Sequence, residues 1–445
     1  MTGQIDANPT KDFFISILVR DISLRDAIGD LVDNCIDGAK RLRGENDYVG
    51  LEVRIEATPE KFSIKDNCGG IDVDIATKYA FRFGRPDQME YTDFSIGQFG
   101  IGMKRALFKL GKKFVVSSKT EKDYFSMGVD VGEWKSNDNW TFQFTDNGVN
   151  EPPISLDETG TSILVPDLHE DSKAAFKVGS QFLQELHNDL ELDQLYNINK
   201  GIRIYLNGNL LRSKKLNLSI SDKFKIGHWE KTYNDEVKVK LIVAIGPHDE
   251  QAGGWYIFCN RRLIVGPDTS KLTGWTGKKG DGVANYHHQY WRFRGFAFFD
   301  AKDSSKLPWN TTKTGMNSDS PIYKDVRAQM IEMMKTVING FLNYLKKERE
   351  SDYSGEKVLH DALKETKLIN LTNDQELKYF YSEDKSFNYP IPDKSRKNLA
   401  PGETIIKYKA DKEKVKKLKQ FFDVTTNSEV GTMSFDYVYD NEIDF

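Results

Sequence analysis

The sequence predicts an α+β protein whose first domain has a mixed or largely antiparallel sheet with helices on one face. Apolar residues at helical spacing indicate an amphipathic helix over residues 22–43, with Ser23 as its N-cap. Segments that alternate polar and apolar residues then follow in series up to residue 165. Strands that run consecutively, rather than alternating with helices, argue against a doubly wound parallel sheet.

The remaining elements follow from the same periodicities, together with the turn residues between them. In the first region we expect strands at 51–57 and 61–65, helices at 75–81 and 103–110, and strands at 114–118, 124–129, 140–144 and 160–165. A connecting helix is expected at 172–190, a hairpin over residues 207–208 that opens a second strand-rich region, and strands at 237–245, 254–265 and 293–299. Helices at 322–345 and 411–422 complete the expected set, and residues 84–95 are expected to form a mobile loop.

Composition excludes several classes of protein. The 445 residues allow about three domains, and the net charge of −4 is too small for a nucleic-acid coat protein. The first residues do not resemble a secretory signal, and no apolar run reaches membrane-spanning length. Three scattered cysteines are too few for a disulfide framework or a structural zinc site. We therefore expect a soluble, cytoplasmic, multidomain protein.

Four separated motifs carry residues suited to binding a nucleotide. Asp30 and Asn34 lie four residues apart on the first helix, so their side chains share one face and suit a magnesium ion and an activated water. Asp66 follows a strand and precedes two glycines, where its carboxylate can accept a ligand donor while the glycines allow close backbone approach. Taken singly, the first pair also fits a solvated polar face, and the second motif fits a glycine turn.

The third motif, GQFGIGMK at residues 97–104, leads into a helix. Backbone N–H groups at a helix N-terminus are free to bind phosphate oxygens, and Lys104 adds a positive charge. The spacing matches neither a Rossmann fingerprint nor a P-loop. The fourth motif is Thr161, whose hydroxyl opens a strand. Each motif alone is weak, but their joint occurrence in this order is informative.

These motifs resemble those of the GHKL ATPase superfamily, which includes the gyrase B subunit, the ninety-kilodalton heat-shock chaperones, histidine kinases, MutL and MORC. The sequences DLVDNCIDGA, DNCGGI and IGQFGIGMK are similar to its first box, its adenine-binding box and its glycine-rich lid hinge. The resemblance covers roughly residues 10–170. It implies an α/β-sandwich ATP-binding domain at 1–175, a ribosomal-protein-like transducer domain at 176–350, and a C-terminal region of unknown role at 351–445.

The resemblance also implies a role for each motif residue. Asp30 takes the position of the general base, Asn34 that of the Mg²⁺ ligand, and Asp66 that of the acceptor for the adenine amino group. Gly70 would lie against the base and Thr161 would close the adenine side through water. The phosphates of ATP would be cradled by Gly97, Gly100, Gly102 and Lys104, and residues 84–95 would form the lid.

Two departures from the family pattern bear on activity. The ATPase branches usually carry Glu where this chain has Asp30, so a side chain shorter by one methylene must reach the water, and we expect slow hydrolysis. Cys68 occupies a position where glycine is common. The first histidine is His169, after the three main motifs, which argues against a histidine kinase.

The second domain favours the MORC and MutL branches. Residues 255–264 resemble the transducer strand that carries N-[RG]-R-L-I, and residues 306–315 resemble the loop that sends a lysine, here Lys313, to the ATP γ-phosphate. A lysine from another domain that contacts only the triphosphate state links domain docking to nucleotide status. Arg261 and Arg262 are interpreted as structural or partner contacts.

The resemblance implies a homodimer that closes on binding ATP, with residues 1–19 exchanged between protomers. The lysine-rich residues 407–419 fit a solvated helix face or, alternatively, a contact with DNA phosphates. Lys278, Lys279, Arg292 and Arg294 form a second candidate basic patch, and DNA is therefore a predicted partner. A separate effector protein is another predicted partner. His287 and His288 are interpreted as incidental.

Three functional hypotheses stay open at this stage. The favoured one is an ATP-dependent clamp acting on DNA or in a DNA-linked system, a defence system being one such setting. The second is a protein-remodelling ATPase of the heat-shock type, and the third is a nucleotide-gated scaffold with little hydrolysis.

Overall fold

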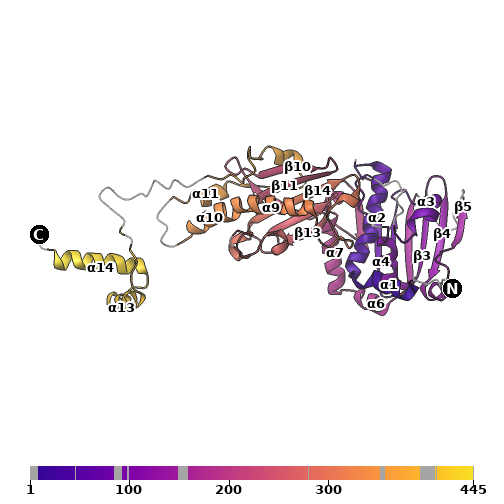
Figure 1. The fold of residues 1–445 in the computed structure, drawn as a ribbon, viewed down its shortest axis with the longest axis horizontal. Coiled ribbons are helices and arrows are strands. Elements are labelled where there is room, and N and C mark those ends of the chain that lie inside the picture. Colours follow the sequence, from indigo (N-terminus) through magenta and orange to yellow (C-terminus); the bar gives the residue numbers. More distant parts are fainter. Residues whose placement is uncertain are drawn as a thin grey trace, which may run out of the picture. The chain divides into compact units, whose positions relative to one another are not determined.

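The computed structural model describes residues 9–45, 47–84, 93–97, 100–148, 159–278, 280–350, 356–390, 406 and 408–443. The chain forms two compact units, Met1–Gly340 with Thr366–Asn388, and Phe341–Glu365 with Tyr389–Phe445. Both large sheets belong to the first unit (Figure 1). No helix among the described residues is long and apolar enough to span a membrane.

The first sheet is mixed, as predicted, and has eight strands in the described part of the chain. They pair in the order β5-β4-β3-β6-β2-β1-β7-β8, and β1 with β7 is the parallel pair. Their bounds are β1 Glu52–Ala57, β2 Phe62–Asp66, β3 Gly111–Lys119, β4 Tyr124–Asp130, β5 Phe144–Gly148, β6 Gly160–Leu168, β7 Arg203–Leu206 and β8 Asn209–Leu210.

Helices α1 (Lys11–Arg20), α2 (Leu24–Arg43) and α4 (Gly102–Leu110) cover one face of this sheet (Figure 1). Strand β1 alternates buried and more exposed residues, which marks the face that the helices cover. Helix α2 begins as predicted, because the Ser23 side chain accepts a hydrogen bond from Asp26 N at 3.1 Å. Further helical segments of this region are α3 Val73–Ile75, η1 Ala76–Ala80, α5 Val131–Ser136, α6 Glu170–Ala175, α7 Gln181–Asp193 and α8 Leu195–Asn199.

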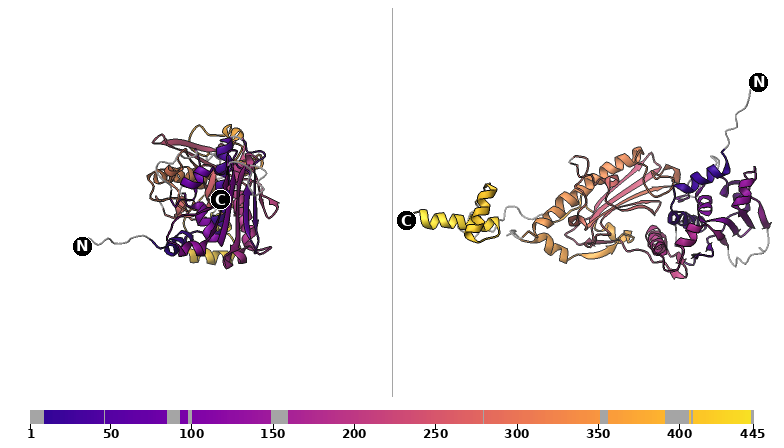
Figure 2. Two further views of the ribbon diagram at one scale, coloured as in Figure 1. Left: turned by 90° about the vertical axis from the view of Figure 1, so that its right-hand side faces the viewer. Right: turned by 90° about the horizontal axis from the view of Figure 1, so that it is seen from below.

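The second sheet contains five strands in the order β10-β11-β14-β12-β13. Their bounds are β10 Gly227–Tyr233, β11 Val237–Ile245, β12 Gly254–Cys259, β13 Arg262–Asp268 and β14 Phe293–Ala301. Helix α9 (Pro321–Lys335) runs along one face (Figure 2), where Tyr323 lies 6.4 Å from Phe299, centroid to centroid. Short 3-10 turns lie at η2 Lys271–Thr273, η3 His288–Tyr290 and η4 Ser304–Lys306.

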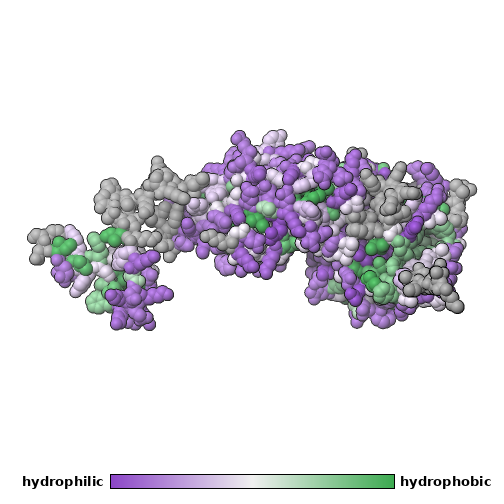
Figure 3. All heavy atoms as spheres, viewed as in Figure 1, coloured by the Kyte–Doolittle hydropathy of each residue, from purple (hydrophilic) through white to green (hydrophobic). Residues whose placement is uncertain are grey.

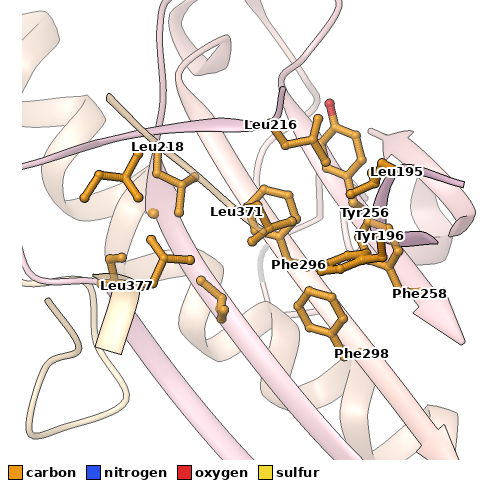
Figure 4. Close-up of a cluster of buried hydrophobic side chains, with 14 of the residues drawn as sticks. Leu195, Tyr196, Leu216, Leu218, Tyr256, Phe258, Phe296, Phe298, Leu371 and Leu377 are labelled. Atoms are coloured by element: carbon orange, nitrogen blue, oxygen red, sulfur yellow. The ribbon is translucent and has the colours of Figure 1, made fainter. Parts of the chain in front are cut away.

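The opposite face of the second sheet carries a separate hydrophobic core (Figure 4). Strands β9 (Asn217–Ile220) and β15 (Lys367–Asn370) pair with each other, and with α12 (Asp374–Lys378) they cover aromatic side chains of β12 and β14. Phe258 and Phe298 stack at 5.0 Å, and Tyr196 of α8 meets Phe258 edge-on at 5.5 Å. Aromatic burial of this size is a major stabilising contribution.

The second unit is helical in its described parts. Its elements are α10 Asn343–Lys347, α11 Val358–Lys364, α13 Lys412–Phe422 and α14 Asn427–Glu442, and η5 Thr336–Leu342 precedes them. Among described residues 408–443 only Val430 is buried. Helices α13 and α14 therefore expose large apolar side chains (Figure 3), including Phe421, Met433, Phe435, Tyr437 and Val438.

Several sequence predictions were wrong in local detail. The expected strand at 140–144 is instead β5, Phe144–Gly148, and the expected helix at 172–190 is broken into α6 and α7. The hairpin over Asn207 and Gly208 forms as predicted, but β7 pairs with β1 and extends the first sheet. Backbone pairing between distant segments decided this placement, and no local pattern reports it.

The most consequential difference lies at residues 254–265, which were predicted to be one strand. They form two strands, β12 and β13, because Asn260 and Arg261 adopt left-handed φ angles of 47° and 67° and reverse the chain. This turn directs Arg262 towards the first domain. Residues 85–92 of the predicted lid and residues 1–8 of the predicted N-terminal arm lie outside the described residues.

Replacing Gly160 by alanine is expected to destabilise the first domain. A Cβ atom at Gly160 would lie 2.0 Å from the Asp66 carbonyl oxygen, so β6 and the end of β2 must separate. We expect a loss of stability of about 1–3 kcal/mol, measured as a lower thermal unfolding midpoint. Gly128→Ala in β4 is the matched control, because its nearest neighbours would lie at 3.8 and 3.9 Å. Equal midpoints for the two variants would contradict the close approach.

Candidate functional site

All ten residues predicted for the site line one cavity of about 280 Å³. They come from α2, the end of β2, the glycine-rich segment, α4, the start of β6 and a loop after β14. These residues are Asp30, Asn34, Asp66, Gly70, Gly97, Gly100, Gly102, Lys104, Thr161 and Lys313. The structure therefore brings together side chains that span 283 positions of sequence, as the Asp30–Lys313 contact shows.

One end of the cavity is built around Asp66, where β2 ends. Its Oδ1 accepts hydrogen bonds from the backbone N–H groups of Cys68, at 2.8 Å, and Thr161, at 3.4 Å. Burial raises the pKa of the Asp66 carboxyl, although these backbone donors partly oppose that shift. Gly70 has φ of 74°, and a Cβ there would lie 2.2 Å from the Lys119 carbonyl oxygen, so a side chain does not fit.

Ser118 organises this end of the cavity, and sequence reasoning did not identify it. Its hydroxyl accepts a hydrogen bond from Ile71 N at 2.7 Å and donates to the Gly160 carbonyl at 3.0 Å. It also lies 3.0 Å from the Thr161 hydroxyl. A buried serine within a strand carries no sequence signal of such a role, because its partners come from two other segments.

Cys35 and Cys68 line the cavity beside Asp66. Both thiols are buried, and burial raises the pKa of each above its ordinary value, with the Asp66 carboxylate adding to the shift. Since the thiolate is the reactive form, these cysteines act as small apolar lining groups.

The glycine-rich segment is anchored to α2 by Asp37. This buried carboxylate accepts hydrogen bonds from Ile96 N at 2.8 Å and from Gly97 N at 2.7 Å. The Gly97 amide is thus already satisfied in the structure. Gly100 has φ of 63°, and residues 98 and 99 lie outside the described residues. Sequence reasoning did not identify Asp33 or Asp37, although their spacing from Asp30 places all three carboxylates near one face of α2.

Lys104 is almost completely buried on α4. Its ammonium group donates to the Ala80 carbonyl at 2.8 Å and lies 5.9 Å from the centroid of the Phe83 ring. Burial lowers the pKa of Lys104 to about 7. At neutral pH this side chain is therefore divided between its charged and neutral forms.

Asp30 is buried between two cations at the centre of the site. Its Oδ1 accepts from Lys313 Nζ at 2.9 Å, and its Oδ2 accepts from a terminal nitrogen of Arg105 at 2.6 Å. A Cβ at Gly102 would lie 3.2 Å from the same Oδ2, so the start of α4 lies directly against Asp30.

Asp33, one helical turn further along α2, joins the first domain to the second sheet. Its carboxylate accepts from Lys313 at 3.1 Å, from Arg262 of β13 at 3.3 Å and from Gln194 at 2.8 Å. Burial favours the neutral acid, yet Arg262 and Lys313 hold the pKa of Asp33 below its ordinary value. Arg262 also pairs with Asp193 at 3.1 Å.

Lys313 is held in its charged form. Burial alone would lower its pKa, but the Asp30 and Asp33 carboxylates raise it above its ordinary value. Lys313 itself adopts a left-handed φ of 55°, so the loop turns sharply at this residue and directs its ammonium group into the cavity. The interpretation of Arg262 as a structural contact agrees with its buried ion pairs.

The second domain also contacts the end of the predicted lid. The Asn260 side chain donates to the Ser95 carbonyl at 3.0 Å and accepts from Ala301 N at 2.9 Å. Phe94 N donates to the Lys302 carbonyl at 3.0 Å, while Lys40 of α2 donates to the Phe94 carbonyl at 2.6 Å. Residues 93–97 are therefore fixed by both domains.

The second predicted basic group is not a surface patch. Arg294 is buried, and its guanidinium donates to the carbonyls of Trp291, Phe293 and Pro247 at 2.8–3.0 Å. It supports the chain around β14. Lys278 is exposed, and Lys279 lies outside the described residues. The lysines of α13 remain largely exposed, and Lys407 is also outside the described residues.

With this geometry in place, comparison with known proteins gives a clear assignment for the first domain. Residues 22–161 match the family described as histidine kinase-, DNA gyrase B-, and HSP90-like ATPase. The mixed sheet, with its helices and nucleotide-type cavity, agrees with that match, and the chain therefore carries a GHKL-type ATPase domain. A comparison with curated proteins found no match for the chain.

Asn34 is suitably placed for the predicted magnesium ion. It lines the cavity one turn from Asp30, where its side-chain oxygen is of the type that Mg²⁺ binds. No group of three His, Cys, Asp or Glu side chains in the described ranges is arranged to hold a metal. A Mg²⁺ ion here would therefore be held by Asn34 together with phosphate and water oxygens, which suits its preference for retained waters.

The low pKa of Lys104 predicts pH-dependent binding of ATP. Phosphate oxygens require the ammonium form, and a free-state pKa of about 7 means that protonation becomes costly above neutrality. If Lys104 contacts the phosphates, the dissociation constant of ATP is expected to rise about fivefold between pH 7 and pH 8, measured by calorimetry. Lys104→Arg keeps its charge and is expected to remove this dependence. ATP itself also titrates, but this affects the wild type and the variant equally and cancels in the ratio of their dissociation constants. A ratio of the wild-type to the Lys104→Arg dissociation constant that does not change between pH 7 and pH 8 would exclude Lys104 as a phosphate ligand.

Proposed function

We propose that this protein binds Mg²⁺·ATP in the described cavity, hydrolyses it slowly, and transmits its nucleotide state to the second sheet through Lys313. The observation that carries the proposal is the pair of buried hydrogen bonds from Lys313 to Asp30 and Asp33, which link a loop of the second domain to the nucleotide helix. Lys313 thereby senses the contents of the cavity from another domain.

The residues of the site divide the chemistry between them. Asp66 and Thr161 bind the adenine end, Asn34 holds Mg²⁺ with the phosphates, and the start of α4 offers backbone N–H groups to phosphate oxygens. In hydrolysis, Asp30 accepts the proton of a water whose oxygen bonds to the γ-phosphorus. The bond between that phosphorus and the β–γ bridging oxygen breaks, and ADP leaves.

The ion pairs of Asp30 favour low activity. Because Lys313 bonds to Oδ1 and Arg105 bonds to Oδ2, the carboxylate must give up one of these contacts before it can orient a water. This arrangement supports the slow-hydrolysis proposal and favours the nucleotide-gated scaffold as the second candidate function. In either case, movement of Lys313 from Asp30 to the γ-phosphate would couple ATP binding to domain position.

Measured ATP turnover separates the two candidates. We expect slow release of phosphate by the wild type, loss of turnover in Asp30→Asn with ATP binding retained, and at least about tenfold slower turnover in Lys313→Ala. Lys324→Ala is the matched control, because this lysine is exposed and pairs only at the surface with Asp319. Wild-type ATP binding without turnover would support the scaffold, and absence of ATP binding would contradict both.

We further propose that ATP closes two copies of this cytoplasmic protein into a clamp on DNA. The exposed lysines of α13 are suited to phosphate contacts, whereas the buried Arg294 is not. Light scattering is expected to show a doubling of mass with a non-hydrolysable ATP analogue and none with ADP. Duplex DNA added at low and high salt is expected to join the dimer in a salt-dependent manner. A monomer under all conditions would contradict the clamp.

A further inference from the structure

Arg105 is a buried cation of the nucleotide cavity to which neither the sequence motifs nor the family match gives a role. It lies on the first turn of α4, directly after Lys104, and it is 4% exposed. One terminal nitrogen of its guanidinium bonds to Asp30 Oδ2 at 2.6 Å. Its Nε has no hydrogen-bond partner among the described residues, although the side chain lines the cavity.

A buried donor without a partner is unusual, because nearly all buried polar groups in proteins are satisfied. Asn34 Nδ2 is in the same condition and lines the same cavity. One donor belongs to Arg105 of α4, which bonds to Asp30, and the other belongs to Asn34, one turn from Asp30 on α2. Unsatisfied donors in the lining of one cavity indicate a ligand that accepts hydrogen bonds, and an anionic oxygen suits an arginine best.

The neighbouring Lys104 is engaged elsewhere. Its ammonium group bonds to the Ala80 carbonyl and has a pKa lowered by burial, whereas a guanidinium stays charged at any physiological pH. Within the first domain, Arg105 is therefore the permanently charged group placed beside Asp30. Lys313 is the corresponding cation from the second domain.

We propose that Arg105 binds the γ-phosphate of ATP and discriminates ATP from ADP from within the nucleotide domain. This inference rests on the proposed function, which places the γ-phosphate beside Asp30. Without the third phosphate, Arg105 neutralises Asp30. With it, the guanidinium donates to phosphate oxygens, through Nε and a terminal nitrogen, and releases Asp30 to accept a proton.

The test compares dissociation constants for a non-hydrolysable ATP analogue and for ADP, measured by calorimetry with Mg²⁺ on the full chain. For Arg105→Gln we expect the analogue to bind at least about tenfold more weakly and ADP to bind within about twofold of the wild type. Arg20→Gln is the matched control, because that arginine is exposed and lies outside the cavity lining. It is expected to leave both constants unchanged.

Arg105→Lys provides a second variant that keeps the charge if the glutamine variant folds poorly. It is expected to recover part of the lost affinity for the analogue, because one ammonium replaces a two-donor guanidinium. Equal weakening of ADP and analogue, or no change in either, would overturn the inference and leave the proposed function intact. A wild-type protein that binds neither nucleotide would overturn both.

Discussion

The burial of two carboxylates on one helix is the constraint on which the rest of this structure depends. Asp30 and Asp33 lie inside the protein, where an unpaired charge is prohibitively costly. Their compensating cations come from three separate places: α4 supplies Arg105, β13 supplies Arg262, and the loop after β14 supplies Lys313. Helix α2 is therefore held in this position by ion pairs to α4 and to segments around the second sheet. The ion pairs of Asp30 and Asp33 thus connect the cavity to the second sheet.

This constraint explains several irregular features of the backbone. The turn at Asn260 and Arg261 adopts left-handed conformations, which asparagine tolerates and arginine rarely adopts. It places Asn260 on Ser95, at the end of the predicted lid, and Arg262 on Asp33. Lys313 likewise occupies a left-handed conformation at the point where it enters the cavity. Four of the eight non-glycine residues with positive φ in the described ranges, Phe94, Asn260, Arg261 and Lys313, therefore lie where segments of the second sheet meet the cavity.

The ion pairs of Asp30 also bear on the expectation of slow hydrolysis. Its side chain is one methylene shorter than the glutamate usual in the ATPase branches, which limits its reach. Its bonds to Arg105 and Lys313 are a second and independent limit. Under the proposed function, Asp30 would be free to act on a water only when phosphate oxygens compete for its two cations. Hydrolysis and conformational signalling would then depend on the same ion pairs.

Local patterns in the sequence were enough to predict many of the helices, strands and cavity residues of this protein. Helical periodicity and Ser23 located α2, and alternating residues located most strands of the mixed sheet. Four short motifs identified nine residues that line one cavity, and the resemblance of residues 306–315 added Lys313. Tertiary structure alone decided that β7 joins the first sheet, that residues 254–265 reverse at Asn260, and that Arg294 is internal. It also decided the roles of Ser118, Arg105 and Asp33. The physical reason is that motifs and periodicity reflect contacts within one segment of the chain. Hydrogen bonds and ion pairs between distant segments form because burial removes water from polar groups, and only the folded structure decides which groups are buried together.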